Sequence, residues 1–311
     1  MNLLELFKRY EDNDNAITYL ESIRWPNKVI CPYCNSEKIY KHHVNYGEKI
    51  RKRWQCGDCS RPFTVTVGTI FHHTHVPLNK WFWLISLMLN AKKGLSAYQA
   101  ARDLGMRRPT VWSMMHRIRE AMETDEAELL KGIVEMDETY VGGKPRKENR
   151  KDKKDDDEDD NLPKRGRGTK KIPVVGMVER EGKVKTVKMS ALAVSGKNLM
   201  ELVRKHIDIK NTTLMTDQYK GYGGMHMVLN HKTINHSFEY VNGDTHTNTI
   251  ESFWAILKRG IIGQFHKVSV KYLDNYLNEF EYRYNRRKQD TRITLEETLN
   301  RMLILPIKYR I

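Results

Sequence analysis

Four cysteines constrain the fold of this 311-residue chain more than any other feature of its sequence. They form two Cys-x-x-Cys pairs, CPYC and CGDC, with 21 residues between the pairs. Each tight turn presents two thiolates, and two such turns complete a tetrahedron, so the spacing predicts one structural Zn²⁺ site. The predicted ligands are Cys31, Cys34, Cys56 and Cys59. The alternatives are two disulfides or four unrelated thiols, and a chain without a signal peptide disfavours the disulfides.

The residues around the cysteines predict a zinc ribbon. From residue 29 to 67 the cysteine turns alternate with β-prone pieces, Ile39-Tyr40 and 63–67, and residues 1–25 before them predict amphipathic helices. A ribbon either binds DNA or serves as a scaffold. The basic run 49–53, followed by Trp54, favours DNA binding.

The balance of charge indicates a polyanionic partner. The chain has 54 Lys and Arg against 39 Asp and Glu, which gives a net charge of +15 and a pI near 9.5. Double-stranded DNA is the simplest partner for such a charge. No run approaches the roughly 18 uncharged apolar residues of a membrane span, and the N-terminus is too acidic for a signal peptide. We therefore expect a cytoplasmic, nucleoid-associated protein with no membrane partner.

Residues 71–130 predict a helix-turn-helix-like region. An apolar helix over 79–93 precedes a second helix that starts at Ser96 and ends at Gly105, and a third opens at 107–110. A short helix, a turn with glycine and a helix that begins with basic residues are typical of DNA-binding modules. Three helices also pack this way in many domains that do not bind DNA. The predicted DNA contacts here are Arg107, Arg108 and Arg117.

Three carboxylates stand at positions typical of a metal site. Asp137 lies in the middle of the strand-like run 133–143, which two glycines end. Asp217 closes a second strand-like run, and Glu251 opens a helix-like run. Acids from three separate segments that meet at one end of a sheet predict a site for a divalent cation, because hard cations prefer oxygen ligands.

The order of the elements around these acids predicts a mixed sheet in an RNase H-like order. Residues 172–178 and 184–189 read as a β-hairpin, and 196–206 as an amphipathic helix. Residues 144–171 contain an almost purely acidic block between basic flanks, and such a run predicts an inserted loop because it has too little apolar surface to order itself.

Four segments together resemble a known family. They are MDETYVGG, TDQYKGY, HTNTIESFWAILKRGIIGQFH and YLNEFEYRYNRR. With the cysteine pairs, they resemble the DDE transposases of bacterial insertion sequences related to Merlin elements, from Cys31 to about Arg287. The resemblance implies a zinc ribbon, a helical DNA-binding region and an RNase H-like catalytic core. It also implies an enzyme that binds the terminal inverted repeats of its element and catalyses metal-dependent DNA cleavage and strand transfer.

The same resemblance assigns roles to residues. It implies that Asp137, Asp217 and Glu251 are the catalytic acids that bind Mg²⁺ or Mn²⁺. It also implies that Lys258, seven residues after Glu251 and on the same helical face, contacts a DNA phosphate. Some relatives place asparagine in the third role, so Asn248 is an alternative to Glu251. Asn248 is also a candidate N-cap for the helix, which would give Glu251 a capping role. Further predicted DNA contacts are Arg259, Arg286 and Arg287.

The predicted fold class is α+β multidomain. The predicted domains are 1–70 for N-terminal helices and ribbon, 71–130 for the helical region, 131–290 for the catalytic core with its loop at 144–171, and 291–311 for a C-terminal tail helix. We expect a homodimer or higher oligomer on DNA. The alternatives are a regulator derived from a transposase that binds DNA without cutting it, and a nuclease without strand transfer.

Overall fold

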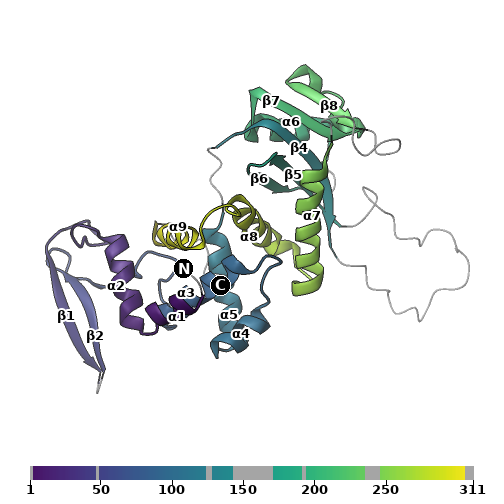
Figure 1. Ribbon diagram of the computed structural model, residues 1–311. Helices are drawn as coiled ribbons and strands as arrows, with labels where there is room; N and C mark the ends of the chain where they lie inside the picture. The colour runs from purple at the N-terminus through teal and green to yellow at the C-terminus, as the bar shows by residue number, and fades with distance from the viewer. Residues whose placement is uncertain are drawn as a thin grey trace, which may run out of the picture. The chain divides into compact units, whose positions relative to one another are not determined.

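A computed structural model describes residues 3–46, 49–123, 128–142, 171–190, 194–234 and 246–304. The chain forms two compact units (Figure 1). The first contains residues 1–123 and 288–311, and the second contains residues 124–287. The predicted inserted loop at 144–171 lies outside the described residues, apart from Lys171.

The first unit is built mainly from helices. They are α1 (Leu3–Arg9), α2 (Asn13–Arg24), α3 (Leu78–Asn90), α4 (Ala97–Leu104), α5 (Arg108–Ala121) and α9 (Thr291–Ile304). The apolar helix α3 is the centre, since Trp81, Phe82 and Leu84 on it are almost fully buried. Helix α9 contacts α2, α3 and α5, so the C-terminal helix belongs to this unit. The four-domain division remains a prediction.

The three central helices of this unit begin and end close to where the sequence predicts. The side chain of Ser96 accepts a hydrogen bond from the backbone N–H of Gln99 at 3.1 Å, which caps α4. Gly105 ends that helix in the left-handed conformation, at φ 61°, which costs glycine little. Helix α5 follows α4 after three residues, so the predicted helix-turn-helix-like arrangement is present.

The ribbon is a three-stranded antiparallel sheet in the order β1-β2-β3. Its strands are β1 (Ile39–Tyr46), β2 (Lys49–Cys56) and β3 (Pro62–Phe63). The predicted strand over 63–67 was wrong beyond Phe63, because the backbone turns there and Val67 N–H donates to the carbonyl of Thr64. The indole N–H of Trp54 donates to Glu21 of α2 at 2.8 Å, which ties the sheet to the N-terminal helices.

The second unit is a five-stranded mixed sheet in the order β6-β5-β4-β7-β8. Its strands are β4 (Leu130–Val141), β5 (Ile172–Glu179), β6 (Val184–Lys188), β7 (Ile207–Asp217) and β8 (Asn230–Ile234). Strands β4, β5 and β6 are antiparallel, whereas β7 and β8 run parallel to β4. This is the RNase H-like order, and the predicted hairpin is confirmed as β5 and β6. The sequence reading missed β8.

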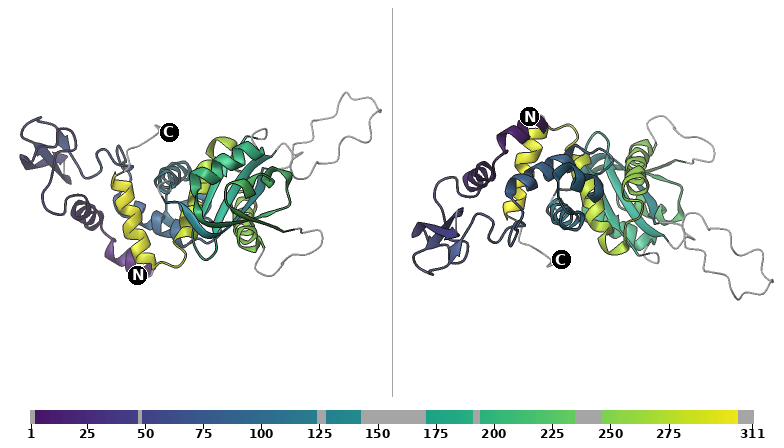
Figure 2. Two further views of the ribbon diagram at one scale, coloured as in Figure 1. Left: turned by 90° about the horizontal axis from the view of Figure 1, so that it is seen from above. Right: turned by 90° about the horizontal axis from the view of Figure 1, so that it is seen from below.

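Helices cover both faces of this sheet (Figure 2). They are α6 (Gly196–His206), α7 (Asn248–Gly260) and α8 (Leu273–Asn285), with 3-10 turns η3 (Lys220–Tyr222), η4 (Met225–Met227) and η6 (Val270–Tyr272) and the π-helical turn η5 (Ile261–Phe265). Val134 and Met136 of β4 pack with Leu199 and Val203 of α6 on one face. Helices α7 and α8 supply the apolar cluster on the other face.

Helix α8 covers the free edge of β6 with hydrogen bonds. The side chain of Asn285 donates to the carbonyl of Val184 at 3.0 Å and accepts from its N–H at 2.7 Å. Glu281 accepts from the N–H of Thr186 at 2.9 Å. These side chains satisfy backbone groups that an edge strand otherwise leaves unpaired. Tyr276 and Phe280 on α8 are buried, so these aromatic side chains of the helix pack on the core.

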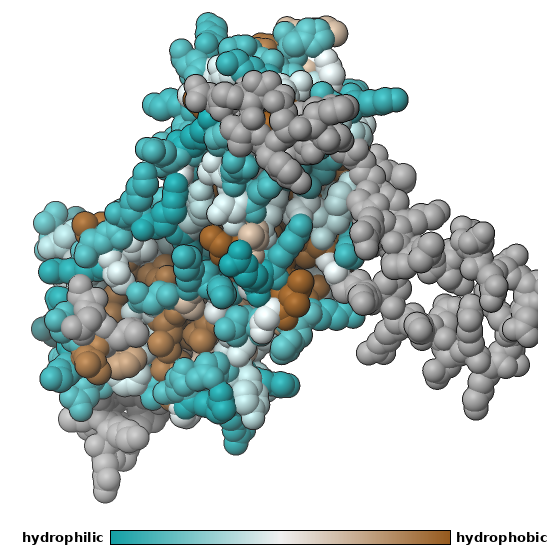
Figure 3. All heavy atoms as spheres, turned by 45° about the vertical axis from the view of Figure 1, so that its right-hand side comes forward, coloured by the Kyte–Doolittle hydropathy of each residue, from teal (hydrophilic) through white to brown (hydrophobic). Residues whose placement is uncertain are grey.

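The face drawn in Figure 3 carries mostly hydrophilic side chains, with smaller apolar patches between them. Large exposed apolar side chains are spread over many elements, among them Tyr98 on α4 and Ile262 in η5. No helix in the described part of the chain is long and apolar enough to cross a membrane.

Candidate functional site

The four cysteines of the ribbon come together as one cluster. Their sulfur atoms all lie within 4.8 Å of one another, and none is in a disulfide. The Sγ atoms of Cys31 and Cys59 are 3.7 Å apart, and those of Cys34 and Cys56 are 3.6 Å apart. Zn–S bonds of about 2.3 Å place tetrahedral sulfur atoms about 3.8 Å apart, so this donor set fits Zn²⁺.

Backbone donors favour the thiolate form of Cys56, which is the form that zinc requires. The N–H of Cys59 donates to Cys56 Sγ, and this bond is the largest of the effects that lower the pKa of the Cys56 thiol to about 6, whereas desolvation and the neighbouring cysteines raise the pKa of the Cys34 thiol to about 12. The N–H of Tyr33 makes the equivalent bond to Cys31. The ribbon therefore has the donor set of a structural zinc centre, formed by the four cysteines that the sequence predicts as its ligands.

Two of the three predicted acids lie side by side in the second unit. Strands β4 and β7 are parallel, and Glu135 is the register partner of Met215. Asp137 and Asp217 each stand two residues further along, on the same face of neighbouring strands. Asp217 ends β7, and its Oδ1 accepts the N–H of Tyr219 at 3.0 Å, which turns the chain away from the sheet.

The environment of Asp137 disfavours its charged form. Burial of the carboxyl raises the pKa of Asp137 to about 7, with further contributions from the adjacent Glu138 and from Asp217. Glu138 points to the α6 face, where it accepts a 2.5 Å hydrogen bond from the hydroxyl of Tyr222. A bound cation would relieve this repulsion between carboxylates.

Helix α7 passes directly over Asp137. The indole N–H of Trp254 donates to Asp137 Oδ2 at 3.1 Å. The indole ring lies against Gly176, the register partner of Asp137 on β5. A Cβ atom at position 176 would lie 2.5 Å from the ring of Trp254 and 2.8 Å from Ile250, so only glycine fits under the helix. Gly176 thus allows Trp254 to reach Asp137.

Glu251 lies three residues before Trp254 on α7, about one turn closer to the start of the helix. It is exposed, and its Oε1 accepts a hydrogen bond from the hydroxyl of Thr247 at 3.1 Å. Lys258 is exposed two turns further along the helix, and Arg259 beside it is also exposed. The structure makes Thr247 the N-cap residue, so the prediction of Asn248 as N-cap was wrong, and Asn248 is an exposed residue of the first turn.

The structure does not gather all three acids into one cluster. Within the described residues, the four cysteines are the only group of three or more His, Cys, Asp or Glu side chains whose ligand atoms lie within 4.8 Å of one another. Asp137 and Asp217 are adjacent, whereas Glu251 stands at the start of the overlying helix.

Sequence reasoning missed three residues around the acids, namely Glu135, Glu138 and Trp254. A signal for the first was present, because Glu135 stands two residues before Asp137 and therefore on the same face of a strand. Glu135 is fully buried. The contact of Trp254 with Asp137 joins residues 117 positions apart, and no local pattern indicates it.

The basic residues that we predict to contact DNA lie in different environments. Arg107 and Arg108 are exposed at the start of α5. Arg117 is half-buried, and its guanidinium donates to the carbonyl oxygens of Ile70 and His72 at 3.1 and 3.2 Å. Arg117 thus holds the segment before α3 against α5.

The two arginines after α8 lie over aromatic rings. The guanidinium of Arg286 is 3.7 Å from the ring centroid of Tyr282, and that of Arg287 is 4.0 Å from that of Tyr284. Arg287 is exposed and also donates to the carbonyl of Gly182 at 2.8 Å. Both arginines therefore contribute to packing at the end of α8.

An RNase H-like sheet with two acids paired on its parallel strands, preceded by a four-cysteine ribbon, defines the class: a zinc-ribbon protein with an RNase H-like core. The chain belongs to the ISXO2-like transposase family. The model of the ISXO2-like transposase domain matches residues 129–285, and that of the transposase zinc-ribbon domain matches residues 11–62. The family predicted from the sequence is thus confirmed.

A relative from Halobacterium salinarum (strain ATCC 700922 / JCM 11081 / NRC-1) matches nearly the whole chain. It is an uncharacterized protein in the transposable element ISH50, 30% identical over 286 residues, which are 89% of this chain and 92% of the relative. Two solved structures are weakly similar. The pre-cleavage Mos1 transpososome is 13% identical over 69% of this chain and 76% of that chain, with a TM-score of 0.27. The Mos1 strand transfer complex is 14% identical over 70% and 73%, with a TM-score of 0.28.

The cysteine cluster predicts one zinc ion per chain. Cys56→Ser should lose that zinc and unfold the ribbon, because a structural zinc contributes folding free energy directly. Elemental analysis of the purified variant, with proteolysis to follow the ribbon, measures both effects. Removing zinc from the wild type with a chelator should give the same proteolytic pattern. A Cys56→Ser protein that keeps one zinc and an intact ribbon would contradict the assignment.

The close contact at Gly176 predicts that this position does not accept a side chain. Gly176→Ala should lower the free energy of unfolding by about 1–3 kcal/mol, because the added methyl group overlaps Trp254 and Ile250. Denaturant unfolding measures the change. Gly263→Ala is the matched control, since a Cβ there meets nothing within 4 Å. Equal stability of the two variants would show that α7 does not pack on β5 as described.

Proposed function

We propose that this protein is the transposase of an insertion sequence, which binds the terminal inverted repeats of its element, cuts DNA there and joins the freed 3'-hydroxyl to target DNA. The observation that carries the proposal is the pairing of Asp137 and Asp217 on the parallel strands of an RNase H-like sheet. Membership of the ISXO2-like transposases supports it, as does the relative in the transposable element ISH50.

The acid pair has the donor chemistry of a site for Mg²⁺ or Mn²⁺. Carboxylate oxygens are the ligands that these hard cations prefer, and burial together with the nearby Glu138 and Asp217 raises the pKa of Asp137. We assign Asp137, Asp217 and Glu251 as the residues that hold the ions. The bound ions would supply Lewis-acid activation of the attacking oxygen and stabilise the leaving oxygen at phosphorus.

The protein's own residues would orient the DNA. Lys258 is exposed on α7 two turns after Glu251, and its ammonium group would contact a phosphate near the acids. Arg259 is exposed next to it. Trp254 keeps one oxygen of Asp137 in a hydrogen bond and so fixes the orientation of that carboxylate.

The first unit would recognise the ends of the element. Arg107 and Arg108 are exposed at the start of α5, where a helix-turn-helix-like module presents residues to the major groove. Arg117, Arg286 and Arg287 have hydrogen bonds or ring contacts within the protein, so a role for them on DNA would add to a packing role. We further propose a homodimer or higher oligomer on DNA, because an element has two ends.

Replacing either paired acid by its amide should abolish cleavage and keep the fold. In Asp137→Asn and Asp217→Asn the amide oxygen can still accept the bonds from Trp254 and from Tyr219 N–H, but the charge that a divalent cation needs is lost. Cleavage of a labelled transposon end in Mg²⁺ should fall to background, while binding of that end, measured by gel shift, should remain near wild type.

A control for this pair is available on the same strand. Asp208→Asn is matched to Asp217→Asn, since Asp208 also accepts a backbone N–H from two residues ahead, that of Lys210 at 3.2 Å. It should cleave normally. Loss of end binding along with cleavage in Asp137→Asn or Asp217→Asn would contradict the separation of recognition from chemistry.

The variant Glu251→Gln tests whether Glu251 binds the metal or only stabilises the start of α7. Glutamine can still accept the bond from Thr247, so stability should stay within about 1 kcal/mol of wild type. Cleavage should nevertheless fall to background because the charge is gone. Glu201→Gln, an exposed glutamate on α6, is the control. Normal cleavage by Glu251→Gln would assign Glu251 to the helix start and make Asn248 the candidate for the third ligand.

A further inference from the structure

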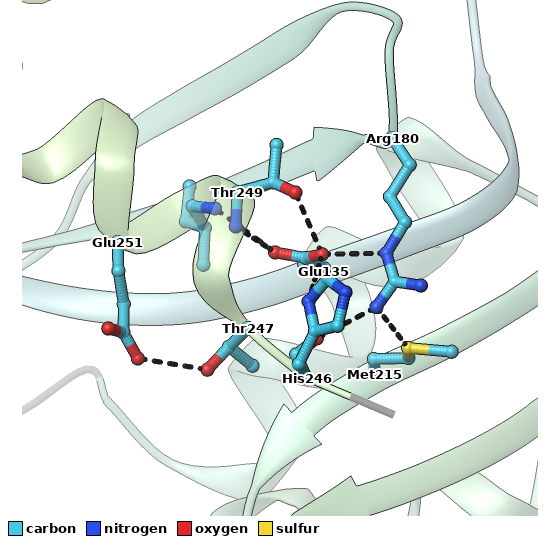
Figure 4. A network of polar contacts seen from close by, with 8 residues as sticks. Glu135, Arg180, Met215, His246, Thr247, Thr249 and Glu251 are labelled. Carbon is cyan, nitrogen blue, oxygen red and sulfur yellow. Dashed lines mark hydrogen bonds and ion pairs between the residues drawn. The ribbon is translucent and has the colours of Figure 1, made fainter. Parts of the chain in front are cut away.

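Glu135 is a buried carboxylate on the same strand and face as Asp137. It has no exposed surface. Figure 4 shows it at the centre of a polar network. Its Oε2 accepts the backbone N–H groups of Thr249 at 2.8 Å and Ile250 at 3.1 Å, and its Oε1 accepts the hydroxyl of Thr249 at 2.9 Å. Glu135 thus contacts the first turn of α7, the helix that carries Glu251.

These contacts replace an ordinary helix cap. Thr249 and Ile250 are the second and third residues of α7, and their N–H groups are those that an N-cap side chain normally satisfies. Thr247, the N-cap residue, makes no such bond, and its hydroxyl instead donates to Glu251. Glu135 therefore caps α7 from a neighbouring strand, where the positive end of the helix dipole also favours its charge.

Arg180 completes the network from the β5–β6 turn. Its Nε donates to Glu135 Oε1 at 2.8 Å, and its terminal NH2 group lies 3.0 Å from Met215 Sδ and 3.1 Å from the carbonyl oxygen of His246. The His246 ring also faces Glu135, with Nδ1 at 3.3 Å from Oε1. One carboxylate therefore ties together β4, β7, a turn and the start of α7.

We propose that Glu135 is a positioning residue for the metal site, which holds the first turn of α7 and so fixes the position of Glu251 over the sheet that carries Asp137 and Asp217. The inference rests on the proposed function, because it takes these three acids as the ligands. Residues that orient metal ligands typically change metal affinity or activity 10- to 100-fold when replaced, which is about the effect expected here.

Glu281 provides a closely matched control in the same unit. It is also buried, and it also accepts a backbone N–H and a hydroxyl from one threonine, those of Thr186 at 2.9 and 3.0 Å. A cation faces it as well, Lys185 at 3.3 Å. Glu281 ties α8 to the edge strand β6, and none of these contacts reaches α7.

The test compares Mn²⁺ binding by full-length Glu135→Gln and Glu281→Gln. Free Mn²⁺ is titrated by electron paramagnetic resonance, and binding by Asp137→Asn is subtracted, so that only the site containing Asp137 is counted. Glu135→Gln should raise the dissociation constant about 10- to 100-fold. Glu281→Gln should leave it unchanged, although both variants lose a comparable buried interaction and should melt at lower temperature. For Glu135→Gln, the Mn²⁺ concentration that gives half-maximal cleavage should rise together with the dissociation constant. For Glu281→Gln it should stay at the wild-type value.

Two results would overturn the inference, and they are distinguishable. If wild-type protein binds Mn²⁺ through Asp137 and the two variants have equal dissociation constants, Glu135 only stabilises the fold. If wild-type protein shows no binding that depends on Asp137, the proposed function fails and the inference fails with it.

A milder pair of variants covers the case in which Glu135→Gln does not fold. Thr249→Val removes one hydroxyl donor to Glu135 and keeps the backbone N–H bonds, and Thr186→Val removes the equivalent donor to Glu281. Thr249→Val should weaken Mn²⁺ binding in the same direction, while Thr186→Val should not. Equal binding by these two variants would also overturn the inference.

Discussion

The second unit depends on the burial of one negative charge. An isolated carboxylate is costly to remove from water, and Glu135 has no exposed surface, so its partners must be in place whenever the unit is folded. Those partners are the guanidinium of Arg180 and the first N–H groups of α7. Because they belong to separate elements, satisfying this one carboxylate fixes the start of α7 over the centre of the sheet.

Among the described residues, Asp137, two residues further along β4, lacks the charged partner that Arg180 provides to Glu135 and lies near other carboxylates instead. Its neighbours include two other carboxylates, Glu138 and Asp217, and the side chain that donates to it is the neutral indole of Trp254. Burial and like charge raise the pKa of Asp137 to about 7. On one strand, therefore, the charge of Glu135 is balanced by donors of the protein, whereas Asp137 lies among other carboxylates. The difference lies in their partners, since both are carboxylates on the same strand and the same face.

Much of this structure follows from local sequence, and the part that does not has a physical reason. Cysteine spacing predicted the metal cluster, and Ser96 and Gly105 predicted the ends of α4, because these signals act within a few residues. The strand β8 was missed because its residues, NHKTI, are mostly polar and show no regular alternation. The cap of α7 was misassigned to Asn248 because the capping group, Glu135, lies 114 residues from Thr249 in the sequence. Such a contact exists only after the sheet has formed.

Two buried glutamates of this unit, Glu135 and Glu281, accept the same kinds of hydrogen bond but hold different elements in place. Glu281 accepts an N–H and a hydroxyl from Thr186 and so closes the edge of β6, where an unpaired strand would otherwise be exposed to other chains. Glu135 accepts the same two groups from Thr249, but at the start of a helix that stands over the acid pair. Buried ion pairs contribute little to stability compared with apolar packing, so their value lies in which elements they hold together. Glu281 therefore keeps α8 on the edge strand β6, and Glu135 keeps the start of α7 in place over the acid pair.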